Sequence, residues 1–265
     1  YKKIEKERAE LGIPPEPLNA EQTADLVELI KENSDEGALL LDLLINSVPA
    51  GVDDAAYVKA AFLNDIATKK ITCDLIDPTK ATFYLGTMLG GYNVEPLINL
   101  LDDDECGDEA VKALSQTLLV FDAFNDVAEK SKDSSNAAKV LKSWAEAEWF
   151  TSKPEVPQSI TTTVFKVPGE TNTDDLSPAP DAWSRPDIPL HALAMYKMPR
   201  QGLSNDPLGE IKKLKEKGHP VCLVGDVVGT GSSRKSATNS VLWHMGDDIP
   251  FIPNKRTGGI CTGTK

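Results

Sequence analysis

The sequence has little cysteine and little histidine, and neither residue type forms a recognisable ligand pattern. Four cysteines occur without any CxxC pair, which excludes the usual zinc motifs and a dense disulfide framework. We therefore expect reduced thiols, mostly buried. The three histidines have no spacing typical of a metal site or a catalytic triad, so each is expected to be structural or exposed. These residues are Cys73, Cys106, Cys222, Cys261, His191, His219 and His244.

Long apolar runs are absent as well. None approaches the roughly 18 to 20 residues needed to cross a bilayer, and the first residues, Tyr-Lys-Lys-Ile-Glu-Lys-Glu-Arg, lack the apolar stretch of a secretory signal. We therefore expect a cytoplasmic protein with no membrane partner. The chain lacks an initiator Met and stops after the Gly/Thr-rich residues 262–265, so we expect a fragment that is incomplete at its C-terminus.

Positive charge is scarce in the first part of the chain. Residues 1–150 carry a net charge of −15 and residues 151–265 carry +2, which together give the −13 of the whole chain. Because a duplex phosphate backbone attracts clustered Lys and Arg, the acidic part argues against non-specific DNA binding. The near-neutral part can hold a local positive patch for a small anion. Its length of 265 residues and 40% hydrophobic content are those of a folded chain with one or two domains.

Apolar residues recur at helical spacing from about residue 19 to 150. Asn19 with Gln22 resembles a capping box, while Asp77-Pro78 is a typical helix start, with Gly90-Gly91 as its end. No strand-like alternation interrupts this part, so six or seven short helices in series indicate antiparallel pairs stacked as an α-solenoid. The other predicted helical segments are 39–45, 55–66, 94–101, 110–128 and 137–150.

The pattern changes after residue 150. Seven prolines lie between Pro154 and Pro189, and proline is unfavourable inside helices and central strands. Residues 161–167 are rich in β-branched side chains and predict a strand, residues 212–217 lie on a predicted helix, and residues 220–225 predict a buried strand. This order favours an α/β domain, with a boundary near residue 155.

A glycine-rich segment, residues 225–236, follows the second predicted strand and leads into a helix through about residue 243. Gly229 and Gly231 allow close approach of the backbone to a ligand, and the N–H groups of a helix start attract an anion. Arg234 can hold a carboxylate through two hydrogen bonds. Because Arg234 stands where a P-loop or a dinucleotide fingerprint requires glycine, both are excluded, and a nucleophile elbow fails too. An ordinary tight turn remains the alternative to an anion site.

A second polar segment, residues 169–187, is stiffened by proline and is predicted to be a long loop. It is either a rigid connection or a second carboxylate clamp. In the second case Arg185 is the clamp and Asp174 orients a partner.

Several segments together resemble the aconitase family. Residues 173–179, Thr-Asp-Asp-Leu-Ser-Pro-Ala, resemble its TDHISPAG-type signature, and residues 229–234, Gly-Thr-Gly-Ser-Ser-Arg, resemble its GxGSSR signature. The resemblance is greatest to the bacterial B-type members and covers essentially the whole chain, because it extends to further segments. These are residues 84–88, 90–93, 143–150, 169–195 and 225–256.

The resemblance implies a multidomain fold. In B-type members an all-α, HEAT-like helical domain precedes the α/β swivel domain, so residues 1–154 are expected to be the former and residues 155–265 the first part of the latter. The family carries a [4Fe-4S] cluster held by three cysteines of a later domain. The resemblance therefore places the cluster ligands outside this chain, and none of its residues is expected to bind metal.

The family interconverts citrate and isocitrate through cis-aconitate, as a hydro-lyase of the citric acid cycle. The resemblance implies that Ser232 is the catalytic base and that Ser232, Ser233, Arg234 and Arg185 bind substrate. Asp174 is implied as a supporting residue, as are Gly229 and Gly231. Asp175 stands where many relatives have His, and its role is open.

Other interpretations remain open at the sequence level. The helical part is alternatively a protein-binding or mRNA-binding regulatory module without a catalytic role, which binds RNA when the cluster is lost, or the interface of a homodimer. A small isomerase subunit is disfavoured because such subunits lack a long helical extension. Hydration of 2-methyl-cis-aconitate, in place of or beside citrate turnover, is also open. The chain alone is expected to be inactive, since the remaining catalytic domains are its partners.

Overall fold

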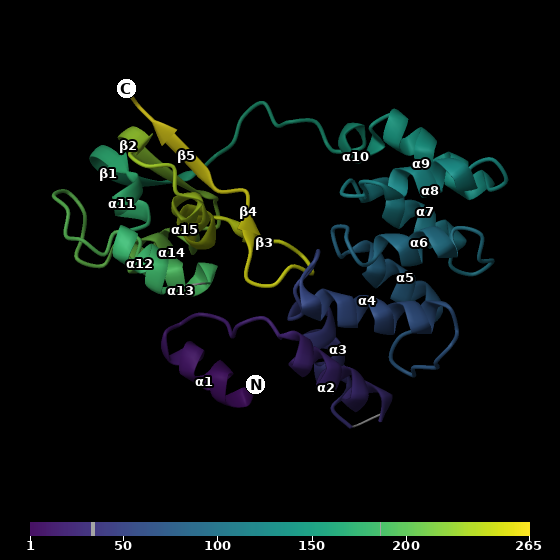
Figure 1. The fold of residues 1–265 in the computed structure, drawn as a ribbon. Coiled ribbons are helices and arrows are strands. Elements are labelled where there is room, and N and C mark those ends of the chain that lie inside the picture. The colour runs from purple at the N-terminus through teal and green to yellow at the C-terminus, as the bar shows by residue number, and fades with distance from the viewer. Residues whose placement is uncertain (33–34, 186) are drawn as a thin grey trace. The chain divides into compact units, whose positions relative to one another are not determined.

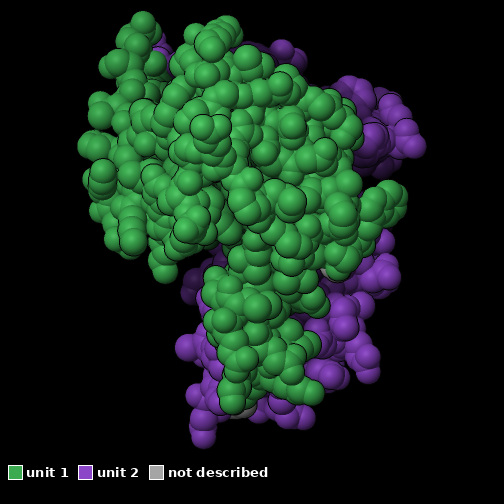
Figure 2. Space-filling view, turned by 90° about the vertical axis from the view of Figure 1, so that its left-hand side faces the viewer, with its two compact units in different colours: residues 1–16, 157–249, 254–265 green, residues 17–156, 250–253 purple. Residues whose placement is uncertain are grey.

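The computed structural model describes residues 1–32, 35–185 and 187–265 and divides into two compact units (Figure 2). The helical unit contains residues 17–156 and 250–253, and the α/β unit contains residues 1–16, 157–249 and 254–265. About half of the described chain is helical, with a small parallel sheet. The division into a domain of residues 1–154 and a domain of residues 155–265 remains a prediction.

The helical unit consists, in its described residues, of helices with short connections (Figure 1). The capping box of Asn19 and Gln22 is confirmed, because each side chain accepts from the backbone N–H of the other residue. Asp77 caps its helix by accepting from the N–H of Lys80 at 2.7 Å, with Pro78 as the first helical residue. The helices are α2 (Ala20–Lys31), α3 (Gly37–Asn46), α4 (Asp54–Ala67), α5 (Pro78–Gly86), α6 (Val94–Leu100), α7 (Gly107–Gln116), α8 (Ala123–Lys130), α9 (Ser135–Ala145) and α10 (Glu148–Thr151).

Some predicted helix ends were wrong. The segment 110–128 is two helices, α7 and α8, because Thr117 is extended and Phe121 has a left-handed φ of 44°. The segment 137–150 is likewise broken at Ala147, whose φ is 52°. Helix α5 ends at Gly86, before the predicted Gly90-Gly91 stop.

The helices of this unit stack in chain order. Helix α2 packs against α4, α4 against α5, α5 against α7 and α7 against α9, and Figure 1 shows this succession from purple to teal. Leucines such as Leu44, Leu63, Leu85 and Leu114 fill the core with no exposed surface. Near-neighbour stacking is what short amphipathic helices need, since none is stable alone. The HEAT-like description remains a prediction.

The α/β unit is built around a parallel sheet of order β1-β2-β5. The predicted strands at 161–167 and 220–225 are confirmed as parts of β1 and β2, and the predicted helix at 212–217 overlaps α14. A separate antiparallel pair, β3 with β4, follows α15. The elements are α1 (Lys2–Glu10), β1 (Thr163–Asn172), α11 (Thr173–Leu176), α12 (Ala179–Ser184), α13 (Ile188–Ala192), α14 (Pro207–Lys215), β2 (Val221–Thr230), α15 (Lys235–Met245), β3 (Asp247–Asp248), β4 (Arg256–Thr257) and β5 (Ile260–Gly263).

The predicted long loop at 169–187 was wrong. It contains the end of β1 and two short helices, α11 and α12. Asn172 caps α11 by accepting from the N–H groups of Asp174 and Asp175, and Pro180 occupies the first turn of α12, where its missing N–H is tolerated. Asp187 caps the next helix, α13.

One face of the sheet forms the core of the α/β unit. Phe165 and Val167 of β1 are buried, whereas Val164 directly before them is 50% exposed and Lys166 between them is exposed as well, the alternation expected of a strand with one covered face. Ile211 of α14 and Met245 of α15 pack into the same core. Within the described residues no helix has the length and apolar character of a membrane span.

Candidate functional site

The turn between β2 and α15 requires glycine at two positions. Gly229 and Gly231 both have φ of 90°, a region that side chains with a Cβ rarely occupy. A Cβ on Gly231 would also lie 3.3 Å from Oγ1 of Thr173. The N–H of Arg234 then donates to the carbonyl of Ser232 at 2.9 Å, which closes the turn directly before α15.

The turn borders a hollow of about 300 Å³, at the lower end of small-molecule pockets. Ser232, Ser233 and Arg234 form a polar side of this hollow. The structure therefore brings together three of the four predicted substrate-binding residues. The remaining described lining is Thr173, Leu176, Val228, Gly229, Ala237, Thr238, Val241, Leu242, Gly259 and Cys261.

Arg234 is held on one side and has an unused donor on the other. Its Nη2 forms an ion pair and hydrogen bond with Oδ1 of Asp174, so the predicted supporting aspartate does contact the site. The Nε atom of Arg234 is buried and has no hydrogen-bond partner among the residues that the structure describes. Since an unsatisfied buried donor is unfavourable, an acceptor oxygen of a bound anion would stabilise this arginine.

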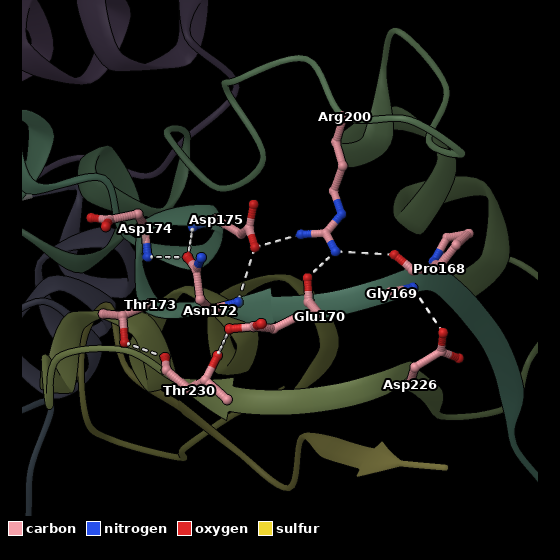
Figure 3. A network of polar contacts seen from close by, with 10 residues as sticks. All are labelled: Pro168, Gly169, Glu170, Asn172, Thr173, Asp174, Asp175, Arg200, Asp226 and Thr230. Atoms are coloured by element: carbon pink, nitrogen blue, oxygen red, sulfur yellow. Dashed lines mark hydrogen bonds and ion pairs between the residues drawn. The ribbon is translucent and has the colours of Figure 1, made fainter. Parts of the chain in front are cut away.

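The other aspartate, Asp175, holds neighbouring segments of the site together through hydrogen bonds (Figure 3). Its Oδ2 accepts from the backbone N–H of Asn172 at 2.9 Å and from Nη1 of Arg200 at 2.5 Å. Arg200 also donates from Nη2 to the carbonyl oxygens of Pro168 and Glu170. Asp175 thus joins α11 to the irregular end of β1, and an aspartate, unlike histidine, supplies the negative charge that pairs with Arg200.

The ends of β1 and β2 are joined by further polar contacts, also visible in Figure 3. Oγ1 of Thr173 donates to the carbonyl of Thr230 at 3.0 Å, and Thr230 in turn donates to a carboxylate oxygen of Glu170. Asp226 accepts from the N–H of Gly169 at 3.0 Å. These bonds bridge the register irregularity of the strand pair and hold the two candidate turns side by side.

Arg185 lies elsewhere in the same unit. Its Nε is 3.1 Å from Oδ1 of the buried Asp181, and its Nη1 donates to the carbonyl of Leu190 at 3.2 Å. Arg185 is absent from the described residues that line the hollow. The sequence interpretation missed Asp181 and Arg200, since no motif marks either residue.

The cysteines of the described chain do not fit an iron–sulfur cluster, which needs several thiolates around one centre. Cys73 and Cys106 lie in the helical unit, whereas Cys222 and Cys261 lie in the α/β unit. Burial raises the pKa of the Cys106 and Cys222 thiols, which disfavours thiolates. The described residues also form no group of three His, Cys, Asp or Glu side chains that can hold a metal.

Fold and site define the class of the protein: a helical unit accompanies an α/β unit whose glycine-rich turn lines a hollow with the residues Ser232, Ser233 and Arg234. The family model described as Aconitate B N-terminal domain matches residues 1–150, and the model described as Aconitate hydratase 2 N-terminus matches residues 162–265. The chain belongs to the aconitate hydratase B family.

Similar proteins from several bacteria support this assignment. Aconitate hydratase B of Pseudomonas aeruginosa is 63% identical over 273 residues, which cover 100% of this chain and 31% of that protein. The Escherichia coli protein of the same name is 60% identical, with 100% of this chain and 32% of that protein covered. The Helicobacter pylori protein is 53% identical, with 99% and 31% covered. The chain thus spans about a third of the length of these curated relatives.

Proposed function

We propose that this chain is the carboxylate-binding and proton-abstracting part of an aconitate hydratase, a hydro-lyase that interconverts citrate and isocitrate through cis-aconitate. One observation carries the proposal: Ser232, Ser233 and Arg234 line one hollow, and the buried Nε–H of Arg234 has no partner among the described residues. The names of relatives at 53–63% identity point to the same reaction. They favour this function over the alternative of a helical protein-binding or mRNA-binding module.

In the proposed reaction Ser232 takes the proton from the carbon next to a substrate carboxylate. The electron pair of that C–H bond forms the double bond of cis-aconitate as the hydroxyl group leaves the neighbouring carbon as hydroxide, which a Lewis-acidic cluster held outside this chain would take up. A serine acts as a base only where its alkoxide is stabilised by N–H donors and cations. The tight turn and the adjacent guanidinium of Arg234 supply such an environment.

The other residues bind and orient the substrate in this proposal. Arg234 and Ser233 hold one carboxylate, and Asp174 fixes the direction of the Arg234 fork. Arg185 binds a second carboxylate with its remaining Nη2 donors, because Nε and Nη1 already bind Asp181 and a carbonyl.

The rest of the enzyme belongs to the same proposal. We place the [4Fe-4S] cluster and its cysteine ligands in parts of the protein outside this chain, so the chain alone is inactive. Residues 1–154 are proposed as the HEAT-like domain and residues 155–265 as the swivel domain. No contact of the described residues bears on the remaining proposals. These are turnover of 2-methyl-cis-aconitate, a cytoplasmic location, and dimer or mRNA contacts of the helical domain.

The test is a Ser232→Ala substitution in the whole protein that carries this chain, reconstituted with iron and sulfide. We expect kcat for citrate to fall at least about 100-fold, the effect of removing a positioned base, while citrate binding stays within about threefold. Ser233→Ala is the matched control, because it removes the neighbouring hydroxyl, and it should mainly raise KM. Unchanged kcat in Ser232→Ala, or the same loss in both variants, contradicts the role of Ser232.

A further inference from the structure

A buried histidine outside the hollow connects two helices of the α/β unit. His191, in α13, is 4% exposed, and its Nε2 lies 2.9 Å from Oγ of Ser177. Ser177 is fully buried, and its Oγ lies 2.7 Å from Oγ of Ser236 in the first turn of α15. The three side chains form one hydrogen-bonded chain from α13 to α15.

This hydrogen-bonded chain ends next to both candidate arginines. Ser236 stands two residues after Arg234, which lines the hollow. At the other end, the backbone of Asp181 forms a hydrogen bond with His191, and the carboxylate of Asp181 binds Arg185. Asp181 is only 6% exposed, so its backbone and side chain are both fixed by these contacts. The network therefore relates the position of one arginine to that of the other.

The surroundings of His191 favour the neutral form of its imidazole. Burial lowers its pKa below the ordinary value, and the hydrogen bond and charge of Asp181 act in the opposite direction. The positive charges of Arg185 and Arg234 lower the pKa further. A neutral imidazole carries one N–H donor and one acceptor nitrogen.

Neutrality fixes the direction of the hydrogen bonds. The backbone carbonyl of Asp181 can only accept, so the N–H of His191 points to it and Nε2 is the acceptor. Nε2 then accepts the hydroxyl proton of Ser177, and Ser177 in turn accepts the hydroxyl proton of Ser236. Each of the two hydroxyls has one defined role, which favours a single geometry for the start of α15.

We infer that His191 is a positioning residue of the proposed active site, which through Ser177 and Ser236 fixes Arg234 relative to the segment that carries Arg185. The inference rests on the proposed function. His191 is absent from the described lining of the hollow, so it acts through these other side chains. Protonation of Nε2 removes the acceptor for Ser177 and weakens this arrangement at acid pH.

The experiment compares His191→Leu with His191→Gln in the whole reconstituted protein. Leu fills the buried space without an acceptor, whereas the amide oxygen of Gln can accept the hydroxyl proton of Ser177. We expect His191→Leu to lower kcat/KM for citrate about tenfold, the size of effect expected for one buried hydrogen bond, with a rise in KM because a carboxylate-binding arginine is displaced. His191→Gln should restore activity to within about threefold of the original protein.

His244→Leu is the matched structural control. His244 lies in α15, and its Nε2 is 2.8 Å from the carbonyl of Ala192 in α13, so it joins the same two helices without touching the network. This variant should be destabilised to a similar degree while kcat and KM stay unchanged. Equal losses of activity in His244→Leu and His191→Leu would reduce His191 to a packing residue and overturn the inference.

A pH profile and Ser232→Ala separate this inference from the proposed function. The acid limb of kcat/KM should weaken in His191→Gln, since Gln does not titrate. If Ser232→Ala leaves turnover intact, the proposed function fails. If Ser232→Ala abolishes turnover and His191→Leu changes neither KM nor the pH profile, the proposed function stands and the positioning role of His191 is wrong.

Discussion

Lys59 is an unfavourable buried charge in the helical unit, and its replacement should stabilise the chain. The side chain is 2% exposed, and its Nζ donates to the carbonyl of Ile45, near the end of α3, at 3.2 Å. Burial lowers the pKa of Lys59 from 10.5 to about 8. Because the ammonium is still charged at pH 7, folding there must move a charge from water into the core.

The size of this penalty follows from the pKa. A folded-state pKa of about 8 against 10.5 for the ordinary lysine costs about 3 kcal/mol at pH 7, because one pKa unit is about 1.4 kcal/mol. Because the pKa of the lysine is lower in the folded state, the full penalty applies below pH 8, and the penalty shrinks as pH rises to 10.5. At pH 10 about 1 kcal/mol remains. Lys59→Met loses the hydrogen bond to Ile45, about 1 kcal/mol, and keeps an apolar chain of similar length.

We therefore expect Lys59→Met to raise the free energy of unfolding by about 2 kcal/mol at pH 7 and by close to zero at pH 10. Urea denaturation with peptide-resolved hydrogen exchange measures the helical unit separately from the α/β unit. Lys112→Met is the control, since this lysine is 72% exposed and should change stability by less than about 0.5 kcal/mol at either pH. A destabilised Lys59→Met variant at pH 7, or a gain that does not shrink by pH 10, refutes the reasoning.

Two further predictions concern the α/β unit. Gly231→Ala should lower the melting temperature and kcat more than Gly229→Ala. Both substitutions place alanine at a positive φ, which costs roughly 1 to 2 kcal/mol, but only the Cβ at position 231 comes close to Thr173. Equal effects of the two substitutions in thermal melts would contradict this contact. Arg8 binds both carboxylate oxygens of Asp187, at 2.7 and 2.8 Å, and is 6% exposed, so Arg8→Met should cost roughly 3 to 5 kcal/mol. Burial raises the pKa of Asp187, but the hydrogen bond and charge of Arg8 outweigh burial and hold this pKa below 3.8. The stability that this pair contributes is therefore present above pH 3.8 and is lost as pH falls below it. An acid titration of the Arg8→Met variant should lack that loss of stability.

The elements that could be predicted from the sequence are those with local causes. Asn19 and Asp77 cap helices through side-chain bonds to residues three positions later, so the signal lies within one turn. The breaks inside the predicted helices at 110–128 and 137–150 could not be found in this way, because Phe121 and Ala147 adopt left-handed φ without glycine. Tertiary packing, not local preference, places those residues there.

The candidate site shows the same division. Gly229, Gly231 and Arg234 were identified from one contiguous segment, because glycine and arginine at a strand-to-helix turn have a direct physical meaning. Arg200 was missed, since its partner Asp175 lies 25 positions away and no spacing rule links them. His191 was expected to be structural or exposed, and only the fold shows that it is buried against Ser177.

The register of the central strands explains why two distant motifs form one site. Strands β1 and β2 run parallel, and Asn172 pairs with Thr230 at their ends. Asp174 comes two residues after the end of β1, and Arg234 comes four residues after the end of β2. Both residues therefore lie at the carboxyl ends of the strands, where they form their ion pair. Ligands of open α/β sheets bind outside the carboxyl ends of the strands. A change that shifts this register would separate Asp174 from Arg234 while leaving both sequence motifs intact, so the site depends on the strand pairing as much as on the motifs themselves.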